Sequence, residues 1–269
     1  MIIFKSINKL NKEVNFKANI GFVPTMGALH KGHISLIKSS KLKCKKTLVS
    51  IFVNPSQFNK SNDYKKYPRK LSNDIKILKK LKVDYLLIPK ISEIYKNKKN
   101  MKIKIHKKDK ILCAKYRPGH FEGVLGVIKQ FLTNIKPKYM FLGEKDYQQI
   151  YLIKKFINNK FNTKIITCKT IRLKNTLPYS SRNFLLSRKA IKKASLITKI
   201  IKKFYLLCNR NFKNIKKTND LKKKIESKKI KIEYIEARNK IDFSKNINKY
   251  NFKIFISFYI NNIRLIDNF

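Results

Sequence analysis

Two histidines three residues apart, His30 and His33, offer the clearest chemistry in this sequence. They end the stretch I-G-F-V-P-T-M-G-A-L-H-K-G-H, residues 20–33, in which a short apolar run gives way to proline and glycine. The apolar run is typical of a buried strand, and the apolar spacing of residues 34–42 predicts a helix. The two imidazoles should therefore lie on one face of a first helical turn, where a strand turns into a helix.

This position favours nucleotide binding. A helix N-terminus presents free N–H groups and the positive end of the helix dipole to phosphate oxygens, and imidazoles can stabilise charge that develops on a transferring phosphoryl group. Gly27 and Gly32 would let a ligand approach the backbone closely. Two other interpretations stay open, because H-x-x-H spacing also suits metal ligation and a tight turn can carry two incidental histidines.

Polar side chains also follow the ends of two further predicted strands. The β-branched run of residues 47–53 is followed by N-P-S-Q-F, which contains Asn54 and Gln57. In open α/β sheets, ligands bind at the carboxyl ends of the strands. An amide such as Gln57 can bond both a carboxylate and a hydroxyl, although Asn-Pro by itself often marks only a turn.

The strand predicted at residues 139–142 ends in G-E-K-D-Y-Q-Q, residues 143–149. Here Lys145 could act as a point charge on phosphate, Asp146 could bond ribose hydroxyls and Gln149 could reach a second ligand. Further along, Ser180, Ser181 and Arg182 offer hydroxyls, amides and a forked guanidinium to triphosphate oxygens.

The elements that must position these residues form an α/β series. Strands and helices alternate up to about residue 172, which predicts a parallel sheet. After residue 184 two amphipathic helices precede three consecutive strands, which predicts a separate, smaller α+β domain. We therefore expect two domains, residues 1–175 and residues 176–269.

Composition narrows the partners. The 269 residues are 43% hydrophobic, enough for a real core, and carry a net charge of +50. Such a charge suggests nucleic acid or an anionic membrane, but lysine is spread through every predicted helix and loop instead of one basic face. We interpret this as drift toward A+T-rich codons. Four widely spaced cysteines, no leader-like segment and no long apolar run predict a soluble cytoplasmic protein.

Taken together, the motifs resemble those of the pantothenate synthetase family, also called pantoate–β-alanine ligase. The resemblance rests on P-T-M-G-A-L-H-K-G-H, S-I-F-V-N-P-S-Q-F, Y-P-R, R-P-G-H-F-E-G-V, G-E-K-D-Y-Q-Q, S-S-R-N and R-L-I-D-N, which occur in the family's order along nearly the whole chain.

The resemblance implies a Rossmann-like nucleotidyltransferase domain that binds ATP and pantoate, followed by a C-terminal lid domain that closes over it. It implies a homodimer that condenses pantoate with β-alanine through a pantoyl adenylate and releases AMP and diphosphate. ATP would be a substrate carried with Mg²⁺, with no tightly bound organic cofactor, no specific nucleic acid and no membrane partner.

The family also implies roles for particular residues. The catalytic residues would be His33, His30 and Lys145. Pantoate would be bound by Gln57, Gln149 and Asn54, β-alanine by Gln57, and Asp74 would be the nearest carboxylate to Mg²⁺. The ATP site would be formed by Met26, Gly27, Ala28, Leu29, His30, Lys31, Gly32, His33, Gly143, Glu144, Lys145, Asp146, Ile171, Tyr179, Ser180, Ser181 and Arg182.

The chain departs from the family pattern in two places. Asn73 stands where a second acid is common, which weakens direct metal ligation by its neighbour Asp74. Asn175 and Thr176 replace an Asp-Gly pair, and Pro178 stiffens the segment between the domains, so we expect retained activity with slower or less complete closure.

Three alternatives compete with this interpretation. Another H-x-G-H nucleotidyltransferase would lack the paired N-P-S-Q-F and G-E-K-D-Y-Q-Q motifs. A nucleic-acid-binding protein would bind RNA with a steep salt dependence. A catalytically decayed relative would have lost some of the residues His30, His33, Lys145 and Arg182, all of which are intact.

Overall fold

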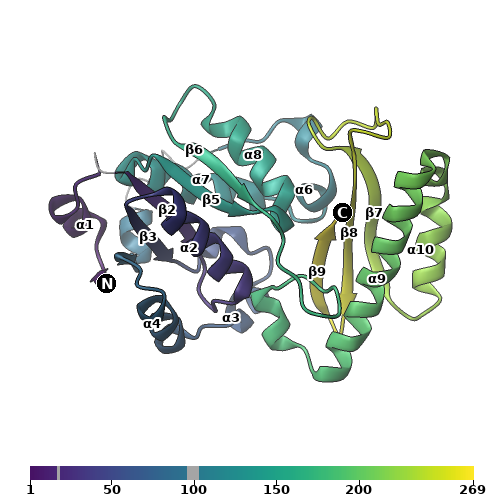
Figure 1. Ribbon diagram of the computed structural model, residues 1–269, viewed down its shortest axis with the longest axis horizontal. Coiled ribbons are helices and arrows are strands. Elements are labelled where there is room, and N and C mark those ends of the chain that lie inside the picture. Colours follow the sequence, from purple (N-terminus) through teal and green to yellow (C-terminus); the bar gives the residue numbers. More distant parts are fainter. Residues whose placement is uncertain (17–18, 96–102) are drawn as a thin grey trace. The chain divides into compact units, whose positions relative to one another are not determined.

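The computed structural model describes residues 1–16, 19–95 and 103–269. Within them, the strands and helices alternate in the first part of the chain, whereas the last three strands follow one another (Figure 1). The strands are β1 Ile2–Phe4, β2 Ile20–Thr25, β3 Lys46–Ile51, β4 Tyr85–Leu87, β5 Tyr139–Gly143, β6 Lys164–Cys168, β7 Lys231–Asn239, β8 Phe252–Ile260 and β9 Ile263–Asn268. The α-helices are α1 Ile7–Glu13, α2 Lys31–Lys43, α3 Ser61–Lys66, α4 Leu71–Lys80, α5 Ile91–Ile94, α6 Leu112–Tyr116, α7 His120–Ile135, α8 Tyr147–Ile157, α9 Arg188–Arg210 and α10 Thr218–Glu226.

Contacts divide the chain into two compact units, Met1–His106 with Arg117–Thr170, and Lys107–Tyr116 with Ile171–Phe269. The second unit thus begins five residues before the expected boundary and includes a short segment from the middle of the chain. Cys113 of α6 accounts for that segment, because its sulfur lies 3.0 Å from the Tyr234 hydroxyl of β7. The assignment of residues 1–175 and 176–269 to separate functions stays a prediction.

The first unit is built on a six-stranded sheet in the order β1-β4-β3-β2-β5-β6, with every pair parallel. This confirms the predicted Rossmann-like α/β fold. From β2 the chain moves outward through β3 to β4, and it later returns to the other side of β2 as β5. The strand order therefore reverses between β2 and β5, and the space outside the carboxyl ends of these strands is the expected place for a ligand.

Both faces of this sheet are covered, by α2 on one side and α7 on the other (Figure 1). Adjacent residues of a strand point to opposite faces. Phe22 of β2 meets Phe131 of α7 edge-on, with ring centroids 5.4 Å apart. Val23 instead belongs to the buried cluster that includes Ile37 of α2. Burial on both faces explains why the central strands are nearly continuous apolar runs.

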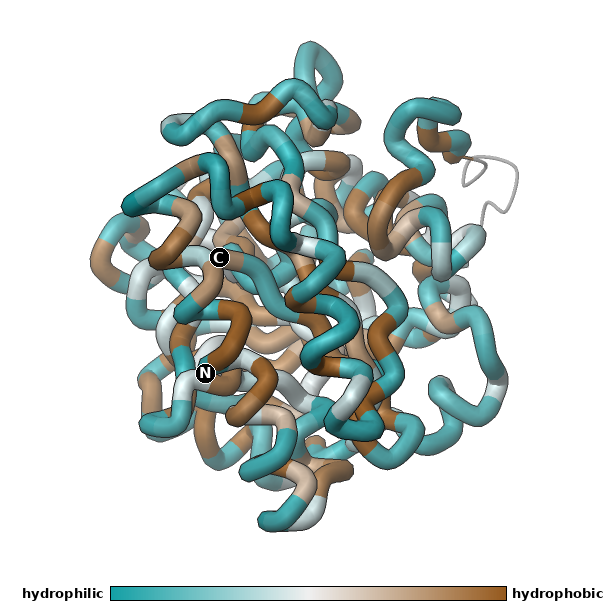
Figure 2. The backbone as a smooth tube through the Cα atoms, turned by 90° about the vertical axis from the view of Figure 1, so that its right-hand side faces the viewer, coloured by the Kyte–Doolittle hydropathy of each residue, from teal (hydrophilic) through white to brown (hydrophobic). Residues whose placement is uncertain are grey.

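The second unit contains the antiparallel sheet β7-β8-β9 with α9 and α10. Its core includes α9 residues that recur every three or four positions, the spacing of one helix face. They are Ala190, Ala194, Ile197, Ile201, Phe204 and Cys208. The helices that face the viewer in Figure 2 alternate between hydrophobic and hydrophilic residues in the same way. The expected α+β unit after the parallel sheet is confirmed.

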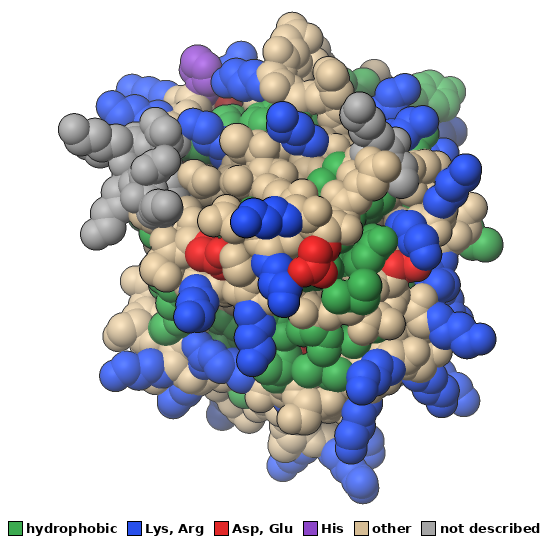
Figure 3. All heavy atoms as spheres, turned by 90° about the vertical axis from the view of Figure 1, so that its left-hand side faces the viewer, with side chains coloured by type: hydrophobic (Ala, Val, Ile, Leu, Met, Phe, Trp, Pro, Cys, Tyr) green, Lys and Arg blue, Asp and Glu red, His purple; other side chains and the backbone are tan. Residues whose placement is uncertain are grey.

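Three observations concern the surface charge, the cysteines and the hydropathy of the helices. Lysine and arginine side chains are distributed over the whole face shown in Figure 3, with few carboxylates among them. All four cysteines are buried and free. Across the described ranges, no helix is both long and apolar enough to cross a membrane.

Candidate active site

The loop that carries His30 and His33 follows the carboxyl end of β2, where the strand order of the sheet reverses. Thr25 closes the strand end, since its hydroxyl donates to the Ser50 carbonyl at 2.7 Å and accepts the Gly27 amide at 3.2 Å. Gly27 and Ala28 then take positive φ angles of 76° and 50°. Such a turn suits glycine but is uncommon for alanine, so the loop needs support from elsewhere in the fold.

Asp74 of α4 supplies that support. Its two carboxylate oxygens accept the amides of Ala28 at 2.8 Å and Leu29 at 2.7 Å. The residue is 1% exposed. Burial raises the pKa of the Asp74 carboxyl, and the two backbone hydrogen bonds act in the opposite direction. A carboxylate 46 residues away in sequence therefore holds the left-handed turn that leads to the histidines.

His30 and His33 stack on each other, with ring centroids 4.0 Å apart and planes 25° from parallel. His30 is the N-cap of α2, and its Nδ1 accepts the Gly32 amide at 3.1 Å. In a neutral ring the hydrogen must then be on Nε2, which makes that atom a donor. The buried Nδ1 of His33 has no hydrogen-bond partner within the described parts of the chain.

Both imidazoles are uncharged near neutral pH. The pKa of His30 is lowered to about 2, mainly by burial and in smaller part by the nearby His33 and Lys145. Burial also lowers the pKa of His33 to about 4, where Asp146 and Lys145 act in opposite directions. Because Lys145 and Asp146 affect the pKa values of the histidines, the loops that follow β2 and β5 lie close together. The sheet order explains this, since β2 and β5 are neighbouring strands.

The β5 loop brings a cation to this edge. Gly143 ends β5, and Glu144–Asp146 form a single 3₁₀ turn before α8. The Lys145 ammonium lies 2.9 Å from the Asp146 carboxylate, and its side chain is only 18% exposed. Gln149 lies in the first turn of α8 and is partly buried. The Lys145 ammonium, held by its ion pair with Asp146, is therefore a positive charge close to two neutral imidazoles.

The β3 end carries the predicted amides in the 3₁₀ turn Pro55–Gln57. Asn54 is 1% exposed; its amide donates to the Gly123 carbonyl at 3.0 Å, and its oxygen accepts the Ser56 amide at 3.3 Å. The Gln57 amide donates to the sulfur of Met26 in the histidine loop. Gln57 therefore lies next to the predicted ATP loop, whereas Asn54 is occupied in holding its own turn.

The remaining predicted residues belong to the second unit. Ile171 and Tyr179 face each other in a short hairpin, because the Tyr179 amide donates to the Ile171 carbonyl at 3.0 Å. Ser180 caps the following 3₁₀ turn by accepting the Arg182 amide at 3.3 Å. The hairpin thus joins Ile171 to the S-S-R segment, a proximity that sequence separation alone did not indicate.

The fit of a protein-held Mg²⁺ is poor. Both oxygens of Asp74 already accept backbone amides, and a hard divalent cation needs several oxygen ligands. Over the residues that the structure describes, no group of three or more His, Cys, Asp or Glu side chains could hold a metal ion. The geometry therefore favours a positioning role for Asp74.

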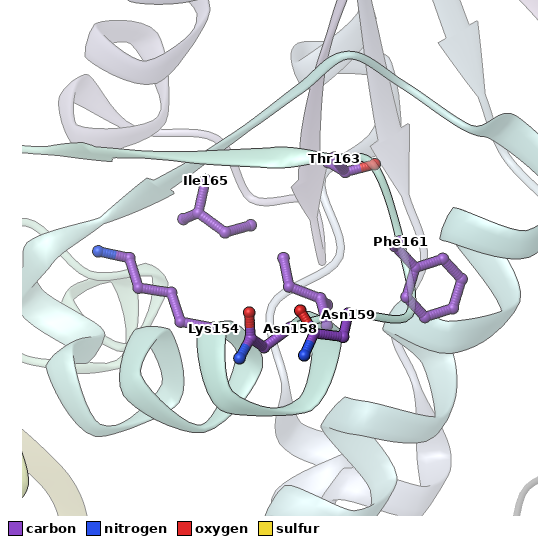
Figure 4. Close-up of a pocket in the computed structure, with 7 residues that line it drawn as sticks. Lys154, Asn158, Asn159, Phe161, Thr163 and Ile165 are labelled. Atoms are coloured by element: carbon purple, nitrogen blue, oxygen red, sulfur yellow. The ribbon is translucent and has the colours of Figure 1, made fainter.

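A separate surface hollow of about 280 Å³ lies at the end of α8 and the start of β6 (Figure 4). Lys154 and Asn158 border it on the helix side, and Thr163 and Ile165 on the strand side. None of the predicted site residues lines it. Its position at the amino end of β6 places it away from the strand ends that carry the histidines.

Sequence reasoning missed two contributors to the site. Arg117 lies in the noted R-P-G-H motif but received no role, and its guanidinium donates to the Gln57 carbonyl at 3.1 Å. The hydroxyl of Tyr95 donates to the Asn54 side-chain oxygen and lies 2.7 Å from the Ser56 hydroxyl. Asp74 was predicted as the carboxylate nearest to Mg²⁺, whereas in the structure it accepts two backbone amides of the loop before the histidines. The motif could have signalled Arg117, whereas no local pattern signals a contact between Tyr95 and Asn54.

A six-stranded sheet of Rossmann-like order, paired histidines at its reversal point and a smaller antiparallel unit define an α/β enzyme of the Rossmann-like class. The family model of pantoate–β-alanine ligase matches residues 2–269. The chain belongs to this family, and it is a ligase that forms pantothenate from pantoate and β-alanine.

Individual relatives agree with this assignment. Pantothenate synthetase of Francisella tularensis subsp. novicida (strain U112) is 44% identical over 274 residues, which cover 100% of this chain and 97% of the relative. A crystal structure of the Francisella tularensis ligase complexed with β-γ ATP and β-alanine matches with a TM-score of 0.87 at 42% identity, covering 100% of this chain and 97% of that one. Pantothenate synthetase from Thermus thermophilus matches with a TM-score of 0.91 at 25% identity, with 100% and 99% covered.

Proposed function

We propose that the enzyme makes pantothenate in two steps that depend on ATP. The pantoate carboxylate attacks the α-phosphorus of ATP and displaces diphosphate, which gives pantoyl adenylate. The amine of β-alanine then attacks the acyl carbon, forms the new amide, releases AMP and loses a proton to the surroundings. The relative crystallised with β-γ ATP and β-alanine supports ATP and β-alanine as substrates here.

The stacked, neutral pair His30 and His33 beside Lys145 is the observation that carries this proposal. Adenylation transfers negative charge to the oxygens around the α-phosphorus, and donors that are already in place stabilise it without reorganisation. The Nε2–H of His30 is such a donor. His33 contributes a buried Nδ1 whose hydrogen bond a substrate would complete, and Lys145 contributes the positive charge.

The other predicted residues bind the substrates. In the first unit, residues 26–33 and Gly143–Asp146 hold ATP. In the second unit, Ile171 bonds the adenine through its backbone, and Tyr179–Arg182 bond the phosphates. Their link through the hairpin supports a joint role for these two segments. The second unit acts as the lid of the site.

We expect pantoate to be bound by side-chain amides. Gln57 and Gln149 hold pantoate, and Gln57 also faces the incoming β-alanine. The contact between Gln57 and Met26 supports this, because it places an amide donor beside the ATP loop. Asn54 contributes by fixing the turn that carries Gln57. Mg²⁺ enters with ATP as part of the substrate, bound by its phosphates.

Assembly and location follow the family resemblance. We expect a homodimer, which size-exclusion chromatography with light scattering tests, and a cytoplasmic enzyme, an inference that the four free cysteines support.

The decisive experiment measures AMP release by the purified protein with ATP and Mg²⁺, with pantoate and β-alanine omitted in turn. We expect release that requires both acids, and a loss of about 10²-fold or more in His33→Ala. Formation of pantoyl adenylate without transfer to β-alanine would limit the proposal to its first step. AMP release that ignores pantoate would overturn it.

A further inference from the structure

The segment that precedes and begins α7 contacts the turn that carries Gln57. Three residues of the motif R-P-G-H-F-E-G face this turn at a spacing of three: Arg117, His120 and Gly123. A Cβ on Gly123 would lie 2.5 Å from the Ser56 carbonyl oxygen and 2.7 Å from its carbon, both backbone atoms. The backbone of α7 therefore packs directly against the P-S-Q turn, with no room for a side chain between them.

The hydrogen bonds of His120 and Arg117 determine one another. The His120 Nδ1 lies 2.7 Å from the Gln57 carbonyl oxygen, and the Arg117 Nη2 lies 3.1 Å from the same oxygen. The Arg117 Nη1 lies 2.9 Å from the His120 Nε2. A guanidinium can only donate, so Nε2 accepts and the ring hydrogen is on Nδ1, where it donates to Gln57. The carbonyl uses both of its lone pairs.

This pair adds outside support to a short segment that has few bonds of its own. Pro55–Gln57 is one 3₁₀ turn of three residues, and the backbone bond from the Gln57 amide to the Asn54 carbonyl is long at 3.4 Å. Such short 3₁₀ pieces have poor hydrogen-bond geometry of their own. The position of the Gln57 backbone, and with it the reach of its amide, therefore depends in part on contacts from outside the turn.

We propose that His120 and Arg117 are positioning residues for Gln57, which act through its backbone carbonyl and so set the affinity of the enzyme for pantoate. This inference rests on the proposed role of Gln57 in binding pantoate. A misplaced binding group weakens every interaction that depends on its position. In this proposal Arg117 and His120 act on pantoate only through Gln57, so their effect should appear in the KM for pantoate and disappear when the Gln57 amide is removed.

The test is a double-mutant cycle with the full-length enzyme, read by AMP release at varied pantoate and varied ATP. His120→Ala should raise the KM for pantoate about tenfold, since one hydrogen bond is lost and the Arg117 donor loses its acceptor. The KM for ATP should stay within about twofold. In a Gln57→Ala background, His120→Ala should have little further effect, because residues that act as a unit are not additive.

Two further variants separate positioning from folding. His120→Asn places an amide donor near the position of Nδ1 and should restore the KM for pantoate to within about threefold of the unmodified enzyme. His106→Ala changes an exposed histidine outside the site and should alter neither KM. Thermal denaturation of each variant shows whether it is folded.

Equal rises in both KM values, additive effects of His120→Ala and Gln57→Ala, or no rescue by asparagine would overturn the inference. So would an unchanged KM for pantoate in His120→Ala. If the unmodified enzyme releases AMP without pantoate, the proposed function fails instead. If Gln57→Ala raises the KM for pantoate and His120→Ala does not, the function stands and only the positioning role is lost.

Discussion

Burial decides what the two site histidines can do. Because burial lowers the pKa of His30 to about 2 and that of His33 to about 4, neither ring is charged at neutral pH. In the proposed mechanism they would therefore act on phosphate as hydrogen-bond donors, and Lys145 would supply the charge. Keeping the roles separate avoids three mutually repelling cations in one small volume.

This arrangement predicts acid sensitivity. In the unfolded chain the imidazoles would bind protons below about pH 6.5, whereas the folded chain binds them only at the lower pKa values of His30 and His33. The folded state thus loses stability as the pH falls from about 6.5 toward 4. Between pH 7 and about pH 5 we expect a loss of roughly 1–3 kcal/mol in the free energy of unfolding, measured by urea denaturation.

The matched variants isolate the histidines. The double change His30→Asn and His33→Asn should reduce this loss, whereas His106→Asn, at an exposed position, should leave it unchanged. An equal acid sensitivity in the double variant would contradict the assignment of neutral rings.

Asp74 gives a second prediction at this scale, because it holds the turn through two amides. Asp74→Asn replaces one acceptor with an NH₂ group that faces a backbone N–H, which costs about 1–3 kcal/mol of stability. The KM for ATP should rise about tenfold, since the turn precedes His30. The Mg²⁺ concentration that gives half-maximal rate should stay unchanged. Asp220→Asn, in the first turn of α10 and exposed, is the control. A raised Mg²⁺ requirement would instead identify Asp74 as a metal ligand.

The hairpin of residues 171–179 contains a strained backbone conformation at its tip that neighbouring contacts hold in place. Its bonds include the Leu173 amide to the Leu177 carbonyl at 2.8 Å. At its tip Thr176 has a φ of 80°, which is strained for a β-branched residue. The Thr176 hydroxyl lies 3.0 Å from that of Thr198, and the Thr176 carbonyl accepts from Arg172 at 3.0 Å. These contacts hold the strained tip in place where the family pattern has a glycine.

We therefore expect the two ways of removing the Thr176 hydroxyl to differ. Thr176→Val keeps the branched Cβ and loses the hydroxyl contact, so the free energy of unfolding should fall by about 1 kcal/mol. Thr176→Gly loses the same contact but also the strain, which is worth roughly 1–2 kcal/mol. The glycine variant should thus be the more stable of the two by about 1 kcal/mol in urea denaturation. The reverse order would show that the positive φ is not strained.

The same elements show how far sequence reasoning reaches. β2, β3 and β5 were predicted because burial on both faces requires continuous apolar runs, and the chemistry was predicted because parallel strands bring their polar carboxyl ends to one edge. β1 was missed, since it has three residues, two of them exposed, and depends on pairing with β4. The Ser61–Lys66 helix was missed as well, because it buries none of its residues and so has no apolar face.

At the site, residue types were predictable and supporting contacts were not. His30, His33, Lys145 and Gln57 follow strand ends and carry recognisable chemistry. The bonds that fix the loop before the histidines and the Gln57 backbone come from Asp74, Arg117 and His120, which are 45 to 63 residues away in sequence from the groups they hold. No local periodicity encodes such a distance, because it depends on how α4 and α7 pack on the sheet.

At the scale of the whole molecule, the net charge of +50 predicts association with polyanions, and the question is whether that association is specific. Lysine and arginine are distributed over the whole face shown in Figure 3, and charges spread in this way bind phosphates without distinguishing one base sequence from another.

We therefore expect two labelled RNAs of about 20 nucleotides and different sequence to bind equally well, and to lose about 10³-fold in affinity between about 50 and about 200 mM salt. Fluorescence anisotropy measures both quantities. At the higher salt, RNA should leave AMP release unchanged, because the residues proposed to bind substrate were chosen for their motifs and not for surface charge. A sequence preference that persists at about 200 mM salt would instead assign the lysines a nucleic-acid function beside the ligase reaction.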